Sequence, residues 1–303
     1  MDEKSTSELM EAPFRGFSFQ RRKNRFAAVF WMPVMNVATF AGIPLYAYFY
    51  GVNQAHVWMF AALFMASSMA ITMGYHRLFA HAAFNSVRPI EFLLLFFGAG
   101  AYEESALKWA SMHRRHHQFT DTDRDPYNIK RGFFYAHMGW FMFCKQSVEY
   151  NNVMDLEKRP LIMHQHRYFQ IWALASGVLL PLAWGMATGS FLSALLWGVA
   201  AKITLVGHTA FFINSFAHTF GTQPYDKTVS ARDNWIGAIL TNGEGYHNFH
   251  HKFPRDYRNG IRWYHWDPTK WMIWALSKIG ATTELKRVPD ALIRQALEAN
   301  NQL

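Results

Sequence analysis

The sequence predicts an all-α integral membrane protein in which four transmembrane helices form two hairpins, with a helical cap domain on one side of the membrane. Three features support this prediction. Apolar residues are gathered in long stretches, very short links join these stretches in pairs, and histidines cluster in the polar segments that remain. The mean hydropathy of −0.09 is near zero only because apolar and polar blocks lie apart along the chain.

Four apolar stretches have about the 20 residues that a helix needs to cross the hydrocarbon core of a bilayer. The fourth contains Lys202 and His208, which are unusual inside a span. A fifth stretch, 90–102, is too short to cross and should be interfacial or buried. Four buried helices of a soluble α protein are the alternative, but nearly uncharged runs of spanning length are rare in soluble folds. The predicted spans are 26–51, 56–75, 168–189 and 191–213.

The short links define the topology. "VNQA" joins the first two spans and almost nothing joins the last two, so the segments 1–25, 76–167 and 214–303 should share one side of the membrane. The basic run "RRKNR" precedes the first span, and by the positive-inside rule this side is the cytoplasm, with the site and both termini facing it. The net charge of +9 then reflects topology and anionic lipid and requires no nucleic acid.

We divide the chain into a cytoplasmic N-terminal segment (1–25), a main domain (26–285) and a C-terminal tail (286–303). The single cysteine, Cys144, excludes a disulfide within the chain.

Nine of the 15 histidines fall into four clusters. Residues at i, i+3 and i+4 share one face of a helix, so each HxxHH motif should present three imidazoles in one direction. His76 and His81 are five residues apart, about 140° off-face in a regular helix, so the helix must end or distort between them. The clusters are "HRLFAH" (His76, His81), "HRRHH" (His113, His116, His117), "NSFAH" (His218) and "HNFHH" (His247, His250, His251).

Clustered neutral imidazoles are typical of a metal site for iron, zinc, copper or nickel. Nine ligands are too many for one ion and suit two. Zinc usually takes three or four protein ligands. Nine histidines without cysteine therefore favour a pair of irons that handles dioxygen.

The motifs resemble the three histidine boxes, HxxxxH, HxxHH and HxxHH, of integral-membrane fatty acyl desaturases. The segments "DTDRDPYNIKRGFFYAHMGW", "NSFAHTFGTQPYD" and "GEGYHNFHHKFPRDYR" are similar to those of the stearoyl-CoA Δ9-desaturase group. The resemblance covers about residues 26–285. Alkane hydroxylases and sterol-modifying oxidases share the boxes but lack "NSFAH" and "GEGYHNFHH".

The resemblance implies a diiron centre whose ligands are the nine clustered histidines, with Asn214 holding a metal-bound water. A helix C-terminal cap is the alternative role for Asn214. The implied reaction uses O2 as co-substrate and inserts a cis double bond, at Δ9, into a saturated long-chain acyl-CoA. Two electrons should come from a separate donor, such as cytochrome b5, a ferredoxin or an oxidoreductase, because the chain has no HPGG segment.

The resemblance also implies a substrate tunnel. Trp109 matches a residue at its bend, although ordinary core packing is an alternative role. The family's tunnel threonine falls at Ala210, with Thr209 adjacent, and Phe64 and Ser68 correspond to the tunnel end.

The headgroup site departs from the family pattern. Ser111 and Met112 replace an Arg-Asp pair that helps to hold coenzyme A in animal enzymes, and Cys144 and Lys145 replace an Arg-Lys pair. Of these cations only Lys145 remains, which leaves coenzyme A, phospholipid and acyl carrier protein open as carriers.

Two further classes stay open beside an acyl-CoA desaturase. A related acyl hydroxylase would use the same ligands. A metal transporter or haem-binding membrane protein would differ more, because transport predicts ionisable residues inside the spans. Apart from Lys202 these are nearly absent.

Overall fold

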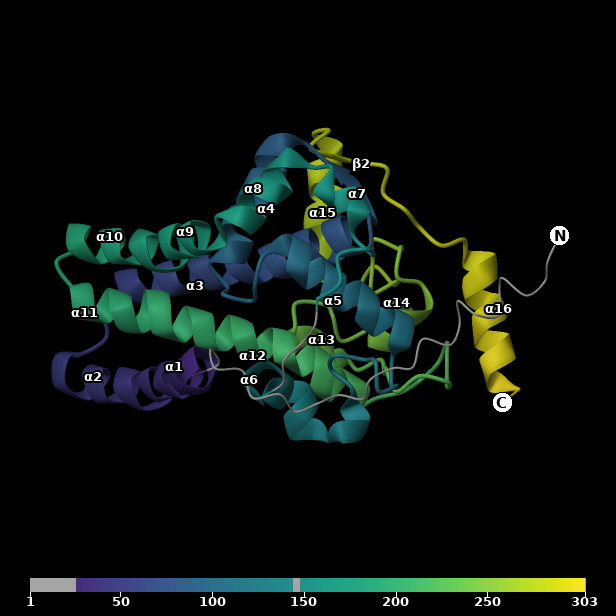
Figure 1. The fold of residues 1–303 in the computed structure, drawn as a ribbon, viewed down its shortest axis with the longest axis horizontal. Helices are drawn as coiled ribbons and strands as arrows, with labels where there is room; N and C mark the ends of the chain where they lie inside the picture. Colours follow the sequence, from purple (N-terminus) through teal and green to yellow (C-terminus); the bar gives the residue numbers. More distant parts are fainter. Residues whose placement is uncertain (1–25, 144–147, 303) are drawn as a thin grey trace.

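The computed structural model describes residues 26–143 and 148–302. The predicted N-terminal segment 1–25 and the predicted headgroup residue Lys145 lie outside the described residues. Four helical segments are long and apolar enough to cross a membrane, and they run alongside one another through the molecule (Figure 1). They are Val29–Tyr50, Gln54–Ala80, Phe169–Ala187 and Phe191–His218.

Each span combines α-helix with a stretch of π-helix. The first contains α1 (Phe26–Val37), η1 (Ala38–Gly42) and α2 (Ile43–Tyr50), and the second contains α3 (Gln54–Met69) and η2 (Ala70–Ala80). The third contains α9 (Phe169–Leu174), η5 (Ala175–Leu179) and α10 (Leu180–Ala187). The fourth contains α11 (Phe191–Ala194), η6 (Leu195–Ala201), α12 (Lys202–Ser215) and the 3₁₀ turn η7 (Phe216–His218).

The remaining elements form the cap, which lies at the end of the spans opposite the two hairpin turns (Figure 1). A two-stranded antiparallel sheet pairs β1 (Asn85–Ser86) with β2 (Thr282–Thr283). The first cap helices are α4 (Arg88–Ala99), α5 (Ala106–Phe119), η3 (Ile129–Arg131), η4 (Tyr135–Gly139), α6 (Trp140–Phe143), α7 (Met154–Glu157) and α8 (Pro160–Arg167). Those after the fourth span are α13 (Trp235–Leu240), α14 (His247–Lys252), α15 (Pro268–Lys278) and α16 (Asp290–Asn301).

The second and fourth spans continue beyond their predicted ends at 75 and 213, because their helices extend without a break into histidine-bearing segments. The first link turns at Gly51, whose φ of 75° favours glycine, and Asn53 then caps α3 by accepting a hydrogen bond from Ala55 N (2.9 Å). The fourth span packs against the first through polar contacts as well as apolar ones. Thr39 donates to Thr204 Oγ1 (3.1 Å), and Tyr46 lies 3.2 Å from Ser190 Oγ.

Lys202 is buried in the fourth span, where a charge is costly unless it is paired. Its Nζ donates to the carbonyl oxygens of Gly100 (2.8 Å) and Gly177 (3.2 Å). The lysine therefore links three segments, the loop after α4 and the third and fourth spans, by satisfying two backbone acceptors.

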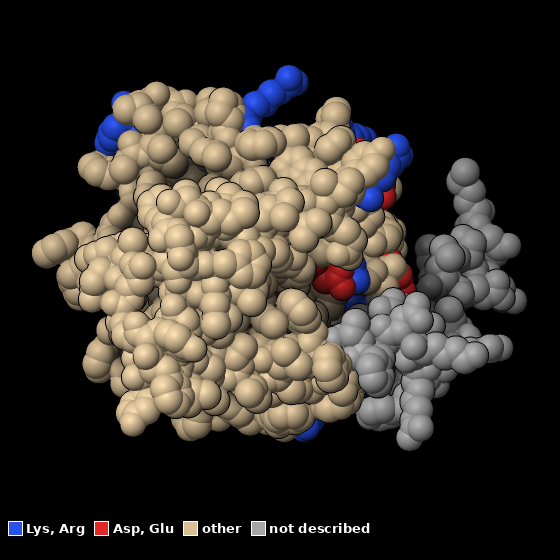
Figure 2. All heavy atoms as spheres, turned by 90° about the vertical axis from the view of Figure 1, so that its left-hand side faces the viewer, with Lys and Arg blue, Asp and Glu red and all other residues tan. Residues whose placement is uncertain are grey.

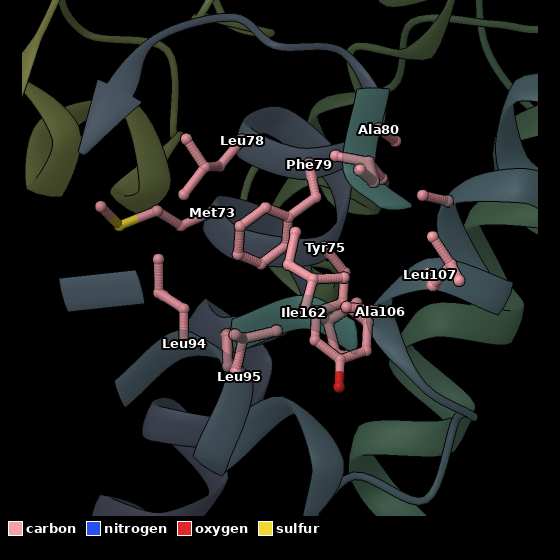
Figure 3. Packing of buried hydrophobic residues seen from close by; sticks show 14 of the residues in the cluster. Met73, Tyr75, Leu78, Phe79, Ala80, Leu94, Leu95, Ala106, Leu107 and Ile162 are labelled. Carbon is pink, nitrogen blue, oxygen red and sulfur yellow. The ribbon is translucent and has the colours of Figure 1, made fainter. Parts of the chain in front are cut away.

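The main core lies where the second span meets α4, α5 and α8 (Figure 3). Tyr75 and Phe79 project from η2 into this core, and the Tyr75 hydroxyl accepts a hydrogen bond from Gln165 Nε2 (2.6 Å). The predicted interfacial or buried stretch 90–102 falls mostly on α4. This helix buries one face through Leu94 and Leu95 and exposes Phe92 and Leu93 on another.

The surface at the hairpin end is almost free of charged side chains, which gather at its rim (Figure 2). Large apolar side chains of the first span, including Phe40, Leu45 and Phe49, are exposed. Such a surface is suited to contact with the hydrocarbon core of a bilayer.

The segment that we separated as a tail contains a packed helix. Ile293 and Ala296 of α16 pack in one cluster with Tyr225 and Phe249. Asn300 accepts a hydrogen bond from Lys227 N (2.9 Å) and donates to the Gln223 carbonyl (2.7 Å). Because Phe249 lies inside the "HNFHH" motif, α16 supports this motif from behind.

We predict that Gly245→Ala destabilises the fold by about 1–3 kcal/mol, because a Cβ at this position would lie 2.0 Å from the backbone nitrogen of Ala238. Thermal unfolding in detergent measures the effect. Gly207→Ala is the matched control: its Cβ would meet only Phe211 at 3.8 Å, so its Tm should stay level or rise. Equal Tm values for Gly245→Ala and the unchanged chain would contradict the prediction.

Candidate metal centre

The nine predicted ligands come together in two adjoining groups in the cap. Within each group, one candidate ligand atom per residue lies within 4.8 Å of all the others. The rings of His117 and His251, which belong to different groups, stack with centroids 4.3 Å apart. The five-histidine group contains His76, His81, His113, His117 and His250, and the four-histidine group contains His116, His218, His247 and His251.

Each HxxHH motif contributes to both groups. "HRRHH" places His113 and His117 in the five-histidine group and His116 in the other. "HNFHH" places His250 in the five-histidine group and its other two histidines in the four-histidine group. The shared helical face therefore directs all three imidazoles of a motif to one region. The histidines at i and i+4 enter one group, and the histidine at i+3 enters the other.

A π-helix brings His76 and His81 together. In η2 the hydrogen bonds run from residue i+5 to residue i, and His81 N donates to the His76 carbonyl (3.1 Å). Five residues then make about one turn, and the two ring centroids are 4.9 Å apart. The distortion that the spacing requires is therefore present over the last turns of the second span.

The nitrogen positions fit metal ions. His76 Nε2 lies 2.9 Å from His250 Nε2, and His81 Nε2 lies 2.8 Å from His113 Nε2. Two nitrogens on one ion at right angles, with bonds of about 2.1 Å, would be about 3 Å apart. His218 Nε2 is buried and has no hydrogen-bond partner among the described residues, as expected of an atom that faces a metal.

Glu244 fixes the tautomer of His76. Its Oε2 accepts from His76 Nδ1 (2.9 Å), so the Nε2 lone pair of the neutral ring faces the five-histidine group. Arg77 (3.0 Å) and Asn259 (2.6 Å) donate to the same carboxylate. Burial alone would raise the pKa of Glu244, but His76 and Arg77 together lower it to about 2. The carboxylate therefore remains charged and holds the ring.

Side chains outside the two groups hold two further predicted ligands, His116 and His218, in the same way. His116 Nδ1 lies 2.8 Å from Asp125 Oδ1, and this contact lowers the pKa of Asp125 although its burial acts in the opposite direction. His218 Nδ1 lies 2.7 Å from Ser230 Oγ, which itself donates to Asp121 (2.5 Å). The hydroxyl proton is thus used, so His218 Nδ1 donates and Nε2 keeps its lone pair.

Sequence reasoning assigned no role to Glu244, Asp125 or Ser230, although the first two lie in the quoted segments "GEGYHNFHH" and "DTDRDP". Metal-bound histidines commonly donate their second N–H to a carboxylate. The presence of acidic residues close to the histidine motifs could therefore have pointed to Glu244 and Asp125.

Burial keeps the imidazoles neutral. It lowers the pKa of six of them well below 6.5, and the neighbouring histidines lower each further. Metal binding requires the unprotonated ring, so these side chains are in the ligand form near pH 7. The six are His81, His113, His117, His247, His250 and His251.

An apolar cavity of about 790 Å³ leads to this centre and is lined by His76, His113 and Glu244. Its walls come from the first, second, third and fourth spans and from the segment 101–113. The volume lies within the range of small-molecule sites.

Apart from the histidines, three of the residues predicted near the substrate or metal line this cavity: Trp109, Ala210 and Asn214. The Trp109 ring stacks on His113 with centroids 4.8 Å apart. Asn214 lies within α12, one residue before its end, so it is not the C-cap of that helix.

The other predicted contacts lie elsewhere. The Thr209 hydroxyl donates to the Val206 carbonyl (2.7 Å), and Thr209, Phe64 and Ser68 are not among the described residues that line the cavity. On the second span the lining begins at Ile71, about one turn closer to His76 than Ser68. Ser111 donates to the Glu149 carbonyl (2.7 Å).

Glu103 is a cavity residue that the sequence did not reveal. Its Oε2 accepts from Trp109 Nε1 (3.3 Å), while its buried Oε1 has no partner among the described residues. Burial raises the pKa of Glu103 to about 8, although the Trp109 N–H acts to lower it. The carboxyl fixes the orientation of the indole that stacks on His113.

The fold and this site define the class: a helical membrane protein with two buried histidine groups that could hold metal ions. Residues 55–282 match the family described as fatty acid desaturase. The chain belongs to the fatty acid desaturase family.

Named relatives agree with this assignment. The chain is 37% identical to the probable acyl-CoA desaturase of Schizosaccharomyces pombe over 99% of its own length and 62% of the relative's. It is 37% identical to acyl-CoA desaturase 1 of Saccharomyces cerevisiae over 88% of its length and 54% of the relative's. It is 33% identical to the stearoyl-CoA desaturase of Sus scrofa over 78% of its own length and 68% of the relative's. The chain thus spans 62% of the length of the first yeast protein and 54% of the length of the second.

We predict that Glu244→Gln weakens iron binding by about 10- to 100-fold, because the amide no longer holds the His76 N–H with a negative charge. Competition between the purified protein and a chelator measures the affinity. Glu104→Gln is the control, since the Glu104 carboxylate forms its ion pair with Lys108 rather than with one of the nine histidines. Equal affinities for Glu244→Gln and Glu104→Gln would contradict the positioning role.

Proposed function

We propose that this chain is an O2-dependent diiron desaturase that inserts a cis double bond, at Δ9, into a saturated long-chain acyl-CoA. The observation that carries the proposal is the apolar cavity of about 790 Å³ that ends against His76 and His113. Such a cavity suits a long hydrocarbon chain whose methylenes must lie beside the metal centre. The names of the relatives, which specify acyl-CoA or stearoyl-CoA, support the choice of substrate.

The reaction removes one hydrogen from each of two adjacent methylenes and forms a C=C bond. O2 is reduced to two waters, and the balance takes two electrons and two protons from outside. Two irons held by the nine histidines would supply the oxidising power for breaking unactivated C–H bonds, which no side chain provides.

The protein's own residues position the chain and exclude water. Trp109, held by Glu103 and stacked on His113, forms the wall where the chain would bend. Asn214 lines the cavity four residues before His218, and we assign it a hydrogen bond to a water at the metal. Phe64, Ser68 and Thr209 keep their predicted tunnel roles as hypotheses, although the chain would have to reach beyond Ile71 to meet the first two.

We further propose that the cap, the metal centre and both termini face the cytoplasm, where a separate protein delivers the electrons. The positive-inside rule supports this orientation, since "RRKNR" directly precedes the first span, and α1, with which this span begins, lies toward the cap (Figure 1). Lys145 remains the proposed headgroup contact.

A metal transporter fits less well. Transport needs ionisable groups along a path through the spans. Lys202, buried in the fourth span, has its Nζ bound to two backbone carbonyls, so it is a structural link.

Expression in a host with suitable electron donors should yield a new unsaturated fatty acid, identified by its double-bond position. His113→Ala should abolish this product because it removes a ligand from the five-histidine group. His164→Ala is the control, since His164 is exposed, accepts a hydrogen bond from Trp172 Nε1 (3.2 Å) and belongs to neither histidine group. Folded, iron-loaded protein that forms no unsaturated product would reject desaturation, and a hydroxylated product would identify a hydroxylase.

The carrier has its own test. Purified, reduced protein should desaturate a saturated acyl-CoA faster than the same chain in phospholipid or on acyl carrier protein. Lys145→Ala should raise KM for the acyl-CoA with little change in kcat, because one cation for an anionic headgroup is lost. A preference for phospholipid would overturn the acyl-CoA assignment and leave desaturation intact.

A further inference from the structure

Two short helices of the cap expose apolar, aromatic faces. Trp235 (65% exposed), Ile236 and Ile239 lie on α13, and Trp271, Met272 and Trp274 (52% exposed) lie on α15. We call these six residues the aromatic face. The opposite sides of both helices are buried, through Gly237 and Ala238 on α13 and through Ile273 on α15. The exposure therefore belongs to one side of each helix.

Contacts with the second span place both helices in depth. The Thr269 hydroxyl at the start of α15 lies 2.7 Å from Thr72 Oγ1, and it lies 3.3 Å from the carbonyl oxygen of Asn242, just after α13. It also lies 3.8 Å from the Met69 sulfur. The two helices thus meet at the level of Thr72, inside the apolar part of the second span.

That level is close to a membrane boundary. The second span runs from Gln54 to Ala80, 27 residues, whereas the hydrocarbon core takes about 20. Counting about 20 residues from Gln54 ends next to Thr72. In Figure 1, α15 runs across the direction of the spans, as a helix in the plane of the interface would.

The chemistry of the face suits this boundary. Tryptophan is enriched where hydrocarbon meets headgroups, and lysine extends from there to the phosphates. Lys278, exposed at the end of α15, lies 4.8 Å from the centre of the Trp274 ring. The loop between the two helices adds Trp263 (84% exposed).

We propose that the aromatic face rests in the headgroup–acyl boundary of the leaflet beside the cap, so that α13 and α15 anchor the cap to lipid in addition to the four spans. The occupant of the face is the bilayer that holds the spans. This contact fixes the depth of the segment between the two helices, which carries Glu244 and the "HNFHH" motif.

Spin labels at single cysteines test the proposal in the full chain reconstituted in phospholipid vesicles. The background is Cys144→Ser, and labels are placed through Ile236→Cys and Trp274→Cys. Leu45→Cys reports a lipid-facing site on the first span, and Leu292→Cys reports α16, which lies far from the hairpin end (Figure 1). Collision rates with O2, which partitions into hydrocarbon, and with a water-soluble nickel chelate are compared at each site.

The ratio of oxygen to nickel collisions at 236 and 274 should be close to that at 45 and higher than that at 292. Ratios that match position 292 would overturn the proposal. Protection from both reagents would also overturn it, since a second copy or another protein would then cover the face. Gel filtration checks the fold, and if Trp274→Cys does not fold, Ile236→Cys alone decides the outcome.

Discussion

The structure depends on holding nine imidazoles in largely buried space with their ring nitrogens facing one another. His81 Nε2 and His113 Nε2, for example, lie only 2.8 Å apart. The rings must therefore be held from outside. Glu244 holds His76 and Asp125 holds His116, each by an N–H to a carboxylate. Metal ions bound between the ring nitrogens would stabilise this arrangement, so metal binding would increase the stability of the fold.

The hydrogen bonds that hold the histidines also connect the cap to the spans. Arg77, next to His76, donates to Glu244, to Asp267 and to the Tyr257 carbonyl, so the end of the second span is tied to the segment before α15. Because Asp267 also caps α15, movement of this helix would disturb the acid that orients a ligand. Membrane depth and ligand geometry are therefore set by one buried network.

A second polar chain joins the first and fourth spans beside the cavity. The Asn36 amide donates to the Met32 carbonyl (2.8 Å), so its Oδ1 must accept from His208 Nε2 (2.8 Å). His208 Nδ1 then accepts from His137 Nε2 (3.0 Å). The other nitrogen of His137, Nδ1, lies 3.0 Å from Ser215 Oγ, so the chain continues to the end of α12. His208, which seemed out of place in a span, closes one wall of the cavity.

Residue patterns predicted the parts of the fold that depend on periodicity and composition. The number of spans among the described residues, the hairpin links and the gathering of the nine histidines follow from apolar runs and from the spacing of one residue type, whereas the second and fourth spans run further than their apolar stretches. The division of "HRRHH" between two groups did not follow, because it depends on how α5 and α14 face each other. Glu244 was missed because it contacts His76, which lies far away in the sequence. Glu103 was missed because its contact with Trp109 depends on how the loop before α5 packs. The tunnel roles of Phe64 and Ser68 came from the family resemblance and stay predictions, since the lining of the cavity on the second span begins at Ile71.

The cavity meets the two groups of histidines unequally. His76 and His113, both of the five-histidine group, line it, whereas none of the four-histidine group is among the described lining residues. A chain held there would approach one metal position, with Trp109 stacked on His113 beside it. The surroundings of the two groups therefore differ. The five-histidine group faces the apolar cavity, whereas the four-histidine group lies next to the Asp125 and Ser230 contacts that hold His116 and His218.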